Sequence, residues 1–359
     1  MHVLQVVTDT DRRGAQVFAT DLGPALTRLG WEVRTVALAE GSVGGLDLPV
    51  LGPSRRSPRT LWALRRAMGD VDVVAAHGST TLPACAIAGV GRRPPFVYRQ
   101  ISESRFWADT PARRARVRAS LGRAAGVVAL WPGAAEVLTS DFGVPAERIT
   151  VVPNGVPPSR FPPADGDERV RARRQLGFSP KTPIIAYLGA LVPEKGVDVV
   201  LRAIGRTSAP ATVIVAGEGP ERAMLERLAG QVAPGRVQLL GSVDDPRTVL
   251  AASDVVVLAS RGGDSMPAVL VEAGLVGRPV VATPVEGIVE IVDDGTTGLL
   301  VPVDDAAALA QAFDALLADP ERRRAMGAAG TRHCRDRYGI DVVAAAWDGV
   351  LRAATAPRA

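Results

Sequence analysis

The chain has 359 residues, enough for about two domains of ordinary size. Hydrophobic residues make up 47% of it, so both domains can bury a core, and the formal net charge is only +4. No basic stretch interleaved with aromatic residues forms a nucleic-acid motif, so we expect no nucleic-acid partner.

Short apolar runs that predict strands alternate with longer amphipathic stretches that predict helices. Strands of a first series are expected at residues 3–7, 33–38, 72–76, 96–99, 126–130 and 149–152. Strands of a second series are expected at residues 183–188, 212–216, 237–240, 255–258, 279–282 and 299–301. Alternation of strands and helices is typical of parallel sheets covered on both faces, so the two series predict two doubly wound α/β domains.

A turn-rich segment at residues 153–158, PNGVPP, indicates the boundary between the two domains. We expect an N-terminal Rossmann-like domain over residues 1–160 and a C-terminal one over residues 161–340. Helices are expected at residues 169–176, 306–318 and 320–337. The final stretch, residues 341–359, can pack back on the first domain through four apolar side chains: Val342, Val343, Trp347 and Val350.

Polar residues and a glycine follow three predicted strands of the first domain. Arg13 and Gly14 lie in the loop after the first strand, His77 follows the strand at 72–76, and Arg99 closes the next strand. Ligands of doubly wound sheets bind at the carboxyl ends of the strands, so these residues are candidates for a cleft. A structural role for His77 and a surface salt bridge for Arg99 are the alternatives.

Two arginine-rich segments of the first domain also contain aromatic residues. Residues 55–66 hold five arginines with Trp62, and residues 104–123 hold Phe106 and Trp107 ahead of a run of arginines. Basic amphipathic segments of this kind can lie against anionic lipid. The alternative, which we favour from sequence alone, is a solvated helix face.

Three loops of the second domain combine glycine with polar groups. Lys195 follows Gly189 and comes just before a predicted helix, where a cation beside free backbone N–H groups makes a diphosphate site. Gly217 follows the next strand and permits close backbone approach. Ser242 and Val243 follow the strand after that.

The segment from Ser253 to Glu272 is the most informative in the chain. Asp264 lies in a glycine-rich turn, Pro267 suits the first turn of a helix, and Glu272 is eight positions after Asp264, a little over two helical turns. Backbone N–H groups between the two carboxylates suit a phosphate. This layout can hold a sugar nucleotide, with one carboxylate for sugar hydroxyls, amides for the diphosphate and the other carboxylate for the ribose.

In this order, the motifs between residues 187 and 300 resemble glycosyltransferase family 4. The family signature, two Glu separated by seven residues, reads here as Asp264-Ser265-Met266-Pro267 and then Glu272-Ala273. The block from Gly189 to Gly196 resembles the family's G-R-L-x-x-x-K-G, and the chain around His77 resembles D-V-V-H-x-H. This chain departs from the family pattern at four positions, where it has a residue of different charge or size. The residues found here are Arg13, Gln16, Ala190 and Asp264.

The resemblance implies a GT-B fold, two Rossmann-like domains facing across a cleft. It implies a retaining glycosyltransferase that moves a sugar from a nucleotide-sugar donor to a hydroxyl of a glycan, glycolipid or small molecule. His77, Lys195 and Asp264 are then the expected catalytic residues, and Arg13 and Arg99 the expected acceptor contacts. The expected donor-binding residues are Gly14, Gly189, Lys195, Gly217, Ser242, Val243, Asp264, Ser265, Met266, Pro267, Ala268 and Glu272.

We expect no metal and no cofactor, because no Asp-x-Asp motif follows a strand and the two cysteines, Cys85 and Cys334, lack metal-like spacing. Free cysteines and the lack of a signal peptide or of about 18 consecutive apolar residues favour a cytoplasmic protein, with peripheral contact at the inner face of the plasma membrane left open. A GT-B sugar-nucleotide epimerase, a phosphorylase and a non-catalytic GT-B module are the alternative functions.

Overall fold

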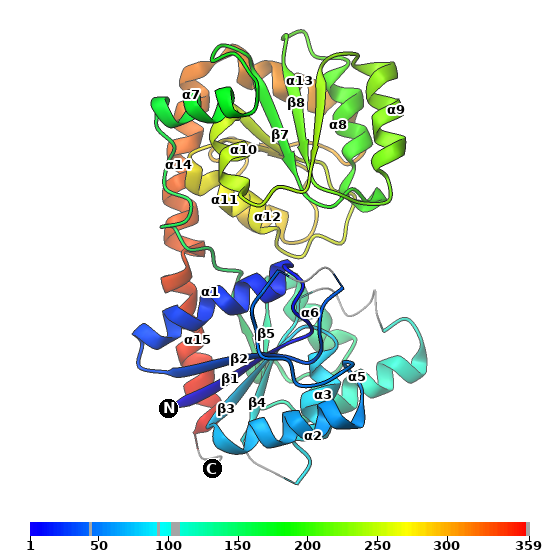
Figure 1. Ribbon diagram of the computed structural model, residues 1–359, viewed down its shortest axis with the longest axis vertical. Coiled ribbons are helices and arrows are strands. Elements are labelled where there is room, and N and C mark those ends of the chain that lie inside the picture. Colours follow the sequence, from blue (N-terminus) through cyan, green and yellow to red (C-terminus); the bar gives the residue numbers. More distant parts are fainter. Residues whose placement is uncertain (43–44, 92–93, 102–107, 357–359) are drawn as a thin grey trace. The chain divides into compact units, whose positions relative to one another are not determined.

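The computed structural model describes residues 1–42, 45–91, 94–101 and 108–356. Two compact units divide the chain (Figure 1). The first unit comprises Met1–Pro157 together with Tyr338–Ala359, and the second comprises Pro158–Arg337. Phe106 and Trp107 of the second arginine-rich segment lie outside the described residues.

The described part of the first unit contains a parallel sheet with the strand order β2-β1-β3-β4-β5-β6. Helices α1 and α15 cover one face, and α2, α3 and α5 cover the other (Figure 1). The strands are β1 (His2–Val7), β2 (Glu32–Ala37), β3 (Val73–His77), β4 (Phe96–Arg99), β5 (Gly126–Ala129) and β6 (Ile149–Val151). The helices are α1 (Gly14–Arg28), α2 (Pro58–Ala67), α3 (Thr81–Ala88), α5 (Pro111–Arg123), α6 (Pro132–Ser140) and α15 (Ile340–Thr355).

The described part of the second unit contains a parallel sheet with the order β12-β11-β10-β7-β8-β9. Helices α8, α9 and α13 lie on one face, and α7, α10 and α11 on the other (Figure 1). The strands are β7 (Ile184–Leu188), β8 (Thr212–Ala216), β9 (Val237–Gly241), β10 (Val255–Leu258), β11 (Val280–Ala282) and β12 (Gly298–Leu300). The helices are α7 (Gly166–Gln175), α8 (Val197–Ile204), α9 (Arg222–Val232), α10 (Pro246–Ala252), α11 (Ala268–Val276), α12 (Ile288–Ile291), α13 (Ala306–Ala318) and α14 (Pro320–Tyr338).

The predicted doubly wound α/β class is confirmed, and all twelve predicted strands are found with ends displaced by at most one residue. The strands can be predicted from the sequence because helices cover both faces of each sheet. Strands buried on both faces are short continuous runs of apolar residues. In β10, for example, all four residues from Val255 to Leu258 are buried.

The C-terminal helix α15 belongs to the core of the first unit. Trp347 is fully buried in the same cluster as Phe18 of α1 and Val73 and Ala75 of β3. Gly155 makes this close packing possible, because a Cβ there would lie 2.8 Å from Ile340 Cδ1. Val342, which we expected among the packing residues, is 48% exposed, because it projects about 100° around the helix from the buried Val343.

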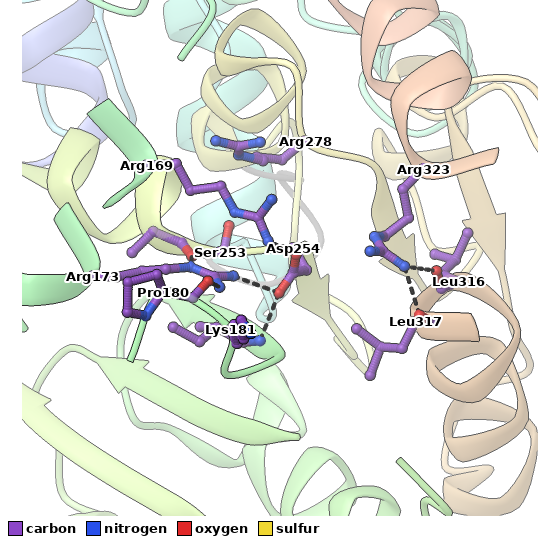
Figure 2. A network of polar contacts seen from close by, with 12 residues as sticks. Arg169, Arg173, Pro180, Lys181, Ser253, Asp254, Arg278, Leu316, Leu317 and Arg323 are labelled. Carbon is purple, nitrogen blue, oxygen red and sulfur yellow. Dashed lines mark hydrogen bonds and ion pairs between the residues drawn. The ribbon is translucent and has the colours of Figure 1, made fainter. Parts of the chain in front are cut away.

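A network of arginines surrounds one buried carboxylate at the amino ends of β7 and β10 (Figure 2). Asp254 Oδ2 accepts hydrogen bonds from Arg173 Nη2 at 2.7 Å and from the Ile184 backbone N–H at 2.8 Å, and Oδ1 pairs with Arg169. Arg173 Nε also donates to the Ala252 carbonyl at the end of α10. Arg278 caps two further carbonyls of the same helix, and burial lowers its pKa to about 10.

These contacts attach α7 and α10 to the edge of the sheet where the strands begin. Arginine side chains here satisfy carbonyls at the negative end of a helix, so they stabilise α10 as well as pairing with Asp254. Arg173 is only 1% exposed, so its charge depends on that one carboxylate.

Asp254→Ala should therefore destabilise the chain strongly. The change leaves the buried Arg173 guanidinium without its anion, and breaking one side of a buried pair costs about 3–5 kcal/mol. Urea unfolding followed by circular dichroism measures the loss. Asp244→Ala is the matched control, since Asp244 is exposed, and it should stay within about 0.5 kcal/mol of the wild type. Equal effects of the two changes would show that the network does not hold the unit together.

Candidate active site

Lys195 and Asp264 meet in the second unit. Lys195 ends a short 3₁₀ turn, Pro193–Lys195, between β7 and α8, and its Nζ forms an ion pair with Asp264 Oδ1. Ser260 Oγ donates to the other oxygen of that carboxylate. The Asp264 side chain is 6% exposed and that of Lys195 is 23% exposed, so the cation keeps a face toward solvent.

Close backbone contacts hold the surrounding loops together. A Cβ on Gly217 would lie 1.8 Å from the Gly189 carbonyl oxygen, and a Cβ on Gly196 would lie 2.0 Å from the Ala259 carbonyl oxygen. Gly217 has φ of 148° and Gly196 has φ of 61°, which favour glycine for a second reason. These contacts place the loops after β7, β8 and β10 directly against one another.

The turn that carries Asp264 leads straight into α11. Ser265 is half-buried, Met266 is buried, and Pro267 occupies the N-cap position of a helix that begins at Ala268. Pro267 offers no side-chain cap to the first amides of this helix. Glu272 lies within α11 and is half-buried.

Two other predicted donor residues lie at the far end of the same sheet edge. Ser242 is exposed and Val243 half-buried, directly after Gly241 of β9. The Gly217 backbone N–H donates to the Gly241 carbonyl at 2.8 Å, which joins this loop to the glycine contact described above.

Arg261 does not compensate for the cation that the family pattern has at Ala190. Its guanidinium bonds Asp304 Oδ1 at 2.6 Å, the Pro193 carbonyl at 2.6 Å and Asp198 Oδ2 at 2.9 Å. The two carboxylates account for its charge and raise its pKa. Arg261 is therefore a structural clamp between the start of α8 and the chain after β12.

The candidate residues of the first unit fall in two environments. Arg13 and Gly14 begin α1 and are exposed, and Arg13 Nη2 bonds Asp11 Oδ2 at 2.8 Å. His77 and Arg99 end β3 and β4 as register partners and are each 1% exposed. Both strand-end positions agree with the sequence, and the buried His77 ring packs against Phe18 of α1 and Trp347 of α15.

Arg99 is a buried cation held without a carboxylate among its described contacts. Its Nη2 bonds Asn154 Oδ1, and its guanidinium carbon lies 3.9 Å from the centre of the Phe18 ring. Its Nε and Nη1 have no hydrogen-bond partner among the described residues. Burial lowers the pKa of Arg99 to about 9.

Sequence reasoning missed the residues that surround His77. These are Gln5, Phe18 and Trp347, which come from β1, α1 and α15. Gln5 carried a readable signal, since it is a polar residue in the middle of an otherwise apolar strand. The contacts of the His77 ring with Phe18 and Trp347 gave no signal in the sequence, because they depend on how the last helix packs.

Comparison with known proteins identifies the family. Residues 12–160 match the model of Glycosyltransferase Family 4, and residues 182–319 match that of Glycosyl transferases group 1. A D-inositol 3-phosphate glycosyltransferase of Xylanimonas cellulosilytica is 31% identical over 386 residues, covering 100% of this chain and 92% of that protein. The chain belongs to glycosyltransferase family 4.

Further relatives of this glycosyltransferase differ in how much they share. A GDP-mannose-dependent monoacylated alpha-(1-6)-phosphatidylinositol monomannoside mannosyltransferase of Corynebacterium glutamicum is 34% identical, over 56% of this chain and 55% of that protein. The structure of Anabaena HepE in complex with UDP-glucose aligns with a TM-score of 0.84 at 20% identity, over 98% of this chain and 99% of that one. The predicted GT-B class is therefore confirmed, and the enzyme uses a nucleotide-sugar donor.

Two absences can be stated for the described residues. They contain no group of three or more His, Cys, Asp or Glu side chains placed to hold a metal ion. None of their helices combines the length and apolar character needed to cross a membrane.

Two glycines at predicted donor contacts should respond differently to alanine. Gly217→Ala should lower the thermal midpoint, because its Cβ would overlap the Gly189 carbonyl. Gly14→Ala should leave the midpoint unchanged or raise it, because a Cβ there meets nothing within 4 Å and alanine favours a helix. If Gly14 admits a ligand close to the backbone, Gly14→Ala should nevertheless lower kcat/KM about tenfold or more. Differential scanning fluorimetry and steady-state kinetics separate the two effects, and unchanged kinetics would remove Gly14 from the site.

Proposed function

We propose that the unit of residues 158–337 binds the nucleotide-sugar donor and that the unit containing residues 1–157 binds the acceptor. The observation that carries the donor assignment is the Lys195–Asp264 ion pair beside the uncapped start of α11. A diphosphate there meets a partly exposed cation and free backbone N–H groups. In this proposal Glu272 binds the ribose, and Ser242 with Val243 binds the nucleobase.

Lys195 and Asp264 then exchange partners when the donor binds. The diphosphate carries more charge than one carboxylate, so it competes for Lys195 and frees an oxygen of Asp264. Ser260 still holds the other oxygen, which keeps the carboxylate in place to accept hydrogen bonds from sugar hydroxyls. Lys195 stabilises the diphosphate as it departs, which supplies electrostatic stabilisation without a metal.

Transfer proceeds with retention of anomeric configuration in this proposal. This proposal leaves no candidate side chain of the donor unit as a covalent nucleophile, since Asp264, still held by Ser260, accepts hydrogen bonds from the sugar hydroxyls. The acceptor hydroxyl approaches on the face from which the phosphate leaves, and a phosphate oxygen takes its proton. The carbon–oxygen bond to the acceptor forms as the bond to the phosphate breaks.

The acceptor is an anionic polyol in this proposal. The relatives act, by their names, on D-inositol 3-phosphate and on a phosphatidylinositol mannoside, and both names include a phosphorylated inositol. Arg13 is exposed, and Arg99 has two unpartnered N–H positions and no carboxylate contact among the described residues. Both can receive a phosphate, which favours a phosphorylated acceptor over a neutral one.

Donor binding is tested by thermal shift with UDP-, GDP-, ADP- and dTDP-sugars. The correct nucleotide at about 100 times its Kd should stabilise the enzyme by about 2.7 kcal/mol, and EDTA should not change this. Lys195→Ala should abolish the shift. Lys181→Ala is the matched control, because Lys181 is the other lysine of the chain and is exposed. A shift that survives in Lys195→Ala would refute the diphosphate site, and a shift lost in EDTA would refute the metal-free mechanism.

Contact with an anionic membrane is a further part of the proposal. Helices α2, α3 and α5 form one layer, and together they carry eight arginines and no acidic residue. Trp62 on α2 is 64% exposed, and Ile87 and Val90 at the end of α3 are 56% and 52% exposed. Exposed apolar side chains on an arginine-rich layer suit the interface of an anionic bilayer, where a lipid-linked acceptor would lie.

Co-sedimentation with vesicles tests this contact. The enzyme should bind phosphatidylglycerol vesicles at low salt, bind phosphatidylcholine vesicles little, and be released by added salt. Arg59→Glu and Trp62→Ala should each weaken binding. Arg324→Glu on α14 makes the same charge change outside the layer and should bind as the wild type does. Equal loss in Arg59→Glu and Arg324→Glu would show attraction by net charge instead of a defined surface.

A further inference from the structure

The ring of His77 is fixed by contacts from three elements. Its centre lies 5.6 Å from that of the Trp347 ring and 6.0 Å from that of Phe18. Its Nε2 lies 3.2 Å from Gln5 Oε1. Gln5 belongs to β1, next to β3 in the sheet, and it is fully buried.

The orientation of the Gln5 amide is fixed by its own partners. Its Nε2 donates to the Ala19 carbonyl at 2.9 Å and to Thr35 Oγ1 at 3.2 Å. An amide nitrogen only donates, so the remaining group, Oε1, is the acceptor that faces His77. The imidazole must then carry its proton on Nε2, which leaves Nδ1 as an acceptor.

The second ring nitrogen of His77 is Nδ1. It is buried and has no hydrogen-bond partner among the described residues. Within the same cluster, Nε and Nη1 of Arg99 and Nε1 of Trp347 are also buried without a described partner. A hydroxyl can satisfy an acceptor and a donor together, because it donates one hydrogen bond and accepts others.

We propose that Gln5 is a positioning residue that holds His77 in the Nε2–H tautomer, so that Nδ1 accepts a hydrogen bond from a substrate hydroxyl that Arg99 donates to. This inference rests on the proposed placement of the acceptor in the first unit. It assigns His77 the role of a hydrogen-bond acceptor and excludes an imidazolium. Trp347 and Phe18 keep the ring plane in place from α15 and α1.

The charges around the ring agree with a neutral imidazole. Burial lowers the pKa of His77 well below 6.5, and the charge of Arg99 on β4 lowers it further. The contacts from α1 and α15 are the uncharged Phe18 and Trp347. Charged side chains of these elements have partners of their own: Arg28 pairs with Asp341, Arg352 with Asp348, and Asp9, after β1, with Arg55 and Gln16. Asp21 of α1 is only half-buried and also has an interaction of its own.

The tautomer is tested directly by long-range ¹H–¹⁵N correlation spectra of the wild type. The chain has three histidines, and His77→Asn assigns the signals of this one. We expect the pattern of a neutral Nε2–H imidazole from pH 6 to 8, within the window that the lowered pKa leaves uncharged. A proton on Nδ1, or a ring that titrates in this range, would overturn the proposal whether or not His77 takes part in transfer.

The pH profile of kcat/KM tests the positioning role. Gln5→Glu places a carboxylate beside Nε2, which favours the imidazolium and raises the pKa of His77. The wild type should show no His77 limb between pH 6 and 8, whereas Gln5→Glu should lose about tenfold per pH unit on the acid side. Adding His77→Asn to Gln5→Glu should remove that limb. An unchanged profile in Gln5→Glu would overturn the proposal.

Gln5→Leu keeps the test decisive if the charged variant folds poorly. It removes the acceptor that holds the proton on Nε2 and adds no charge. The value of kcat should then fall about tenfold or more, with little change in the KM for the donor and no new acid limb in the pH profile. Wild-type kcat in Gln5→Leu would overturn the positioning role. A confirmed tautomer with wild-type kcat in His77→Asn would instead show that the proposed acceptor site lies elsewhere.

Discussion

Backbone contact at glycine is the constraint on which the pairing of Lys195 with Asp264 depends. A Cβ on Gly196 or Gly217 would lie 2.0 or 1.8 Å from a carbonyl oxygen of a neighbouring loop. A Cβ on Gly287 would likewise lie 1.7 Å from the Ser265 carbonyl oxygen. Loops after β7, β8, β10 and β11 can therefore touch without side chains between them. Lys195 and Asp264 are 69 positions apart in the chain, and this contact is what brings them together.

Three buried or half-buried cations, Arg173, Lys195 and Arg99, fall into two kinds. Arg173 and Lys195 each have a carboxylate, in Asp254 and Asp264, so their pairs are complete within the fold. Arg99 has an amide oxygen and an aromatic face instead. A guanidinium buried with this support alone pays a desolvation cost that an incoming anion would offset, since charge-assisted bonds to phosphate are among the strongest available.

The sequence predicts most of the fold because its signals are local. Each strand is a short apolar run bounded by turn residues, and helix 306–318 is found at those residues, with Asp305 as its N-cap. The family motifs could be recognised for the same reason. Each of them, including the block around Lys195 and the spacing from Asp264 to Glu272, lies within one loop or within one loop and the helix after it. A family resemblance built on such segments is specific, and the comparisons confirm it.

What could not be predicted depends on distant partners. His77 was correctly placed at a strand end, but its enclosure requires Trp347 from the last helix and Gln5 from the first strand. Arg261 is a second case, because Asp198 and Asp304, which neutralise its charge, come from separate parts of the chain. Periodicity reports that a residue is buried or exposed, and it does not report which partner it meets.

The ion pair between Lys195 and Asp264 also bears on why the first acid of the signature is an aspartate here. Its short side chain is held at both oxygens, by Lys195 and by Ser260, and Thr283 Oγ1 donates to the Ser260 carbonyl at 2.5 Å. In the proposed exchange of partners, this support keeps the carboxylate rigid after the lysine leaves it. Under that proposal, the turn of Lys195 from the carboxylate to the diphosphate couples the arrival of the leaving group to the exposure of the group that binds the sugar. One residue pair then serves both halves of the donor, which requires the loops after β7 and β10 to stay in contact.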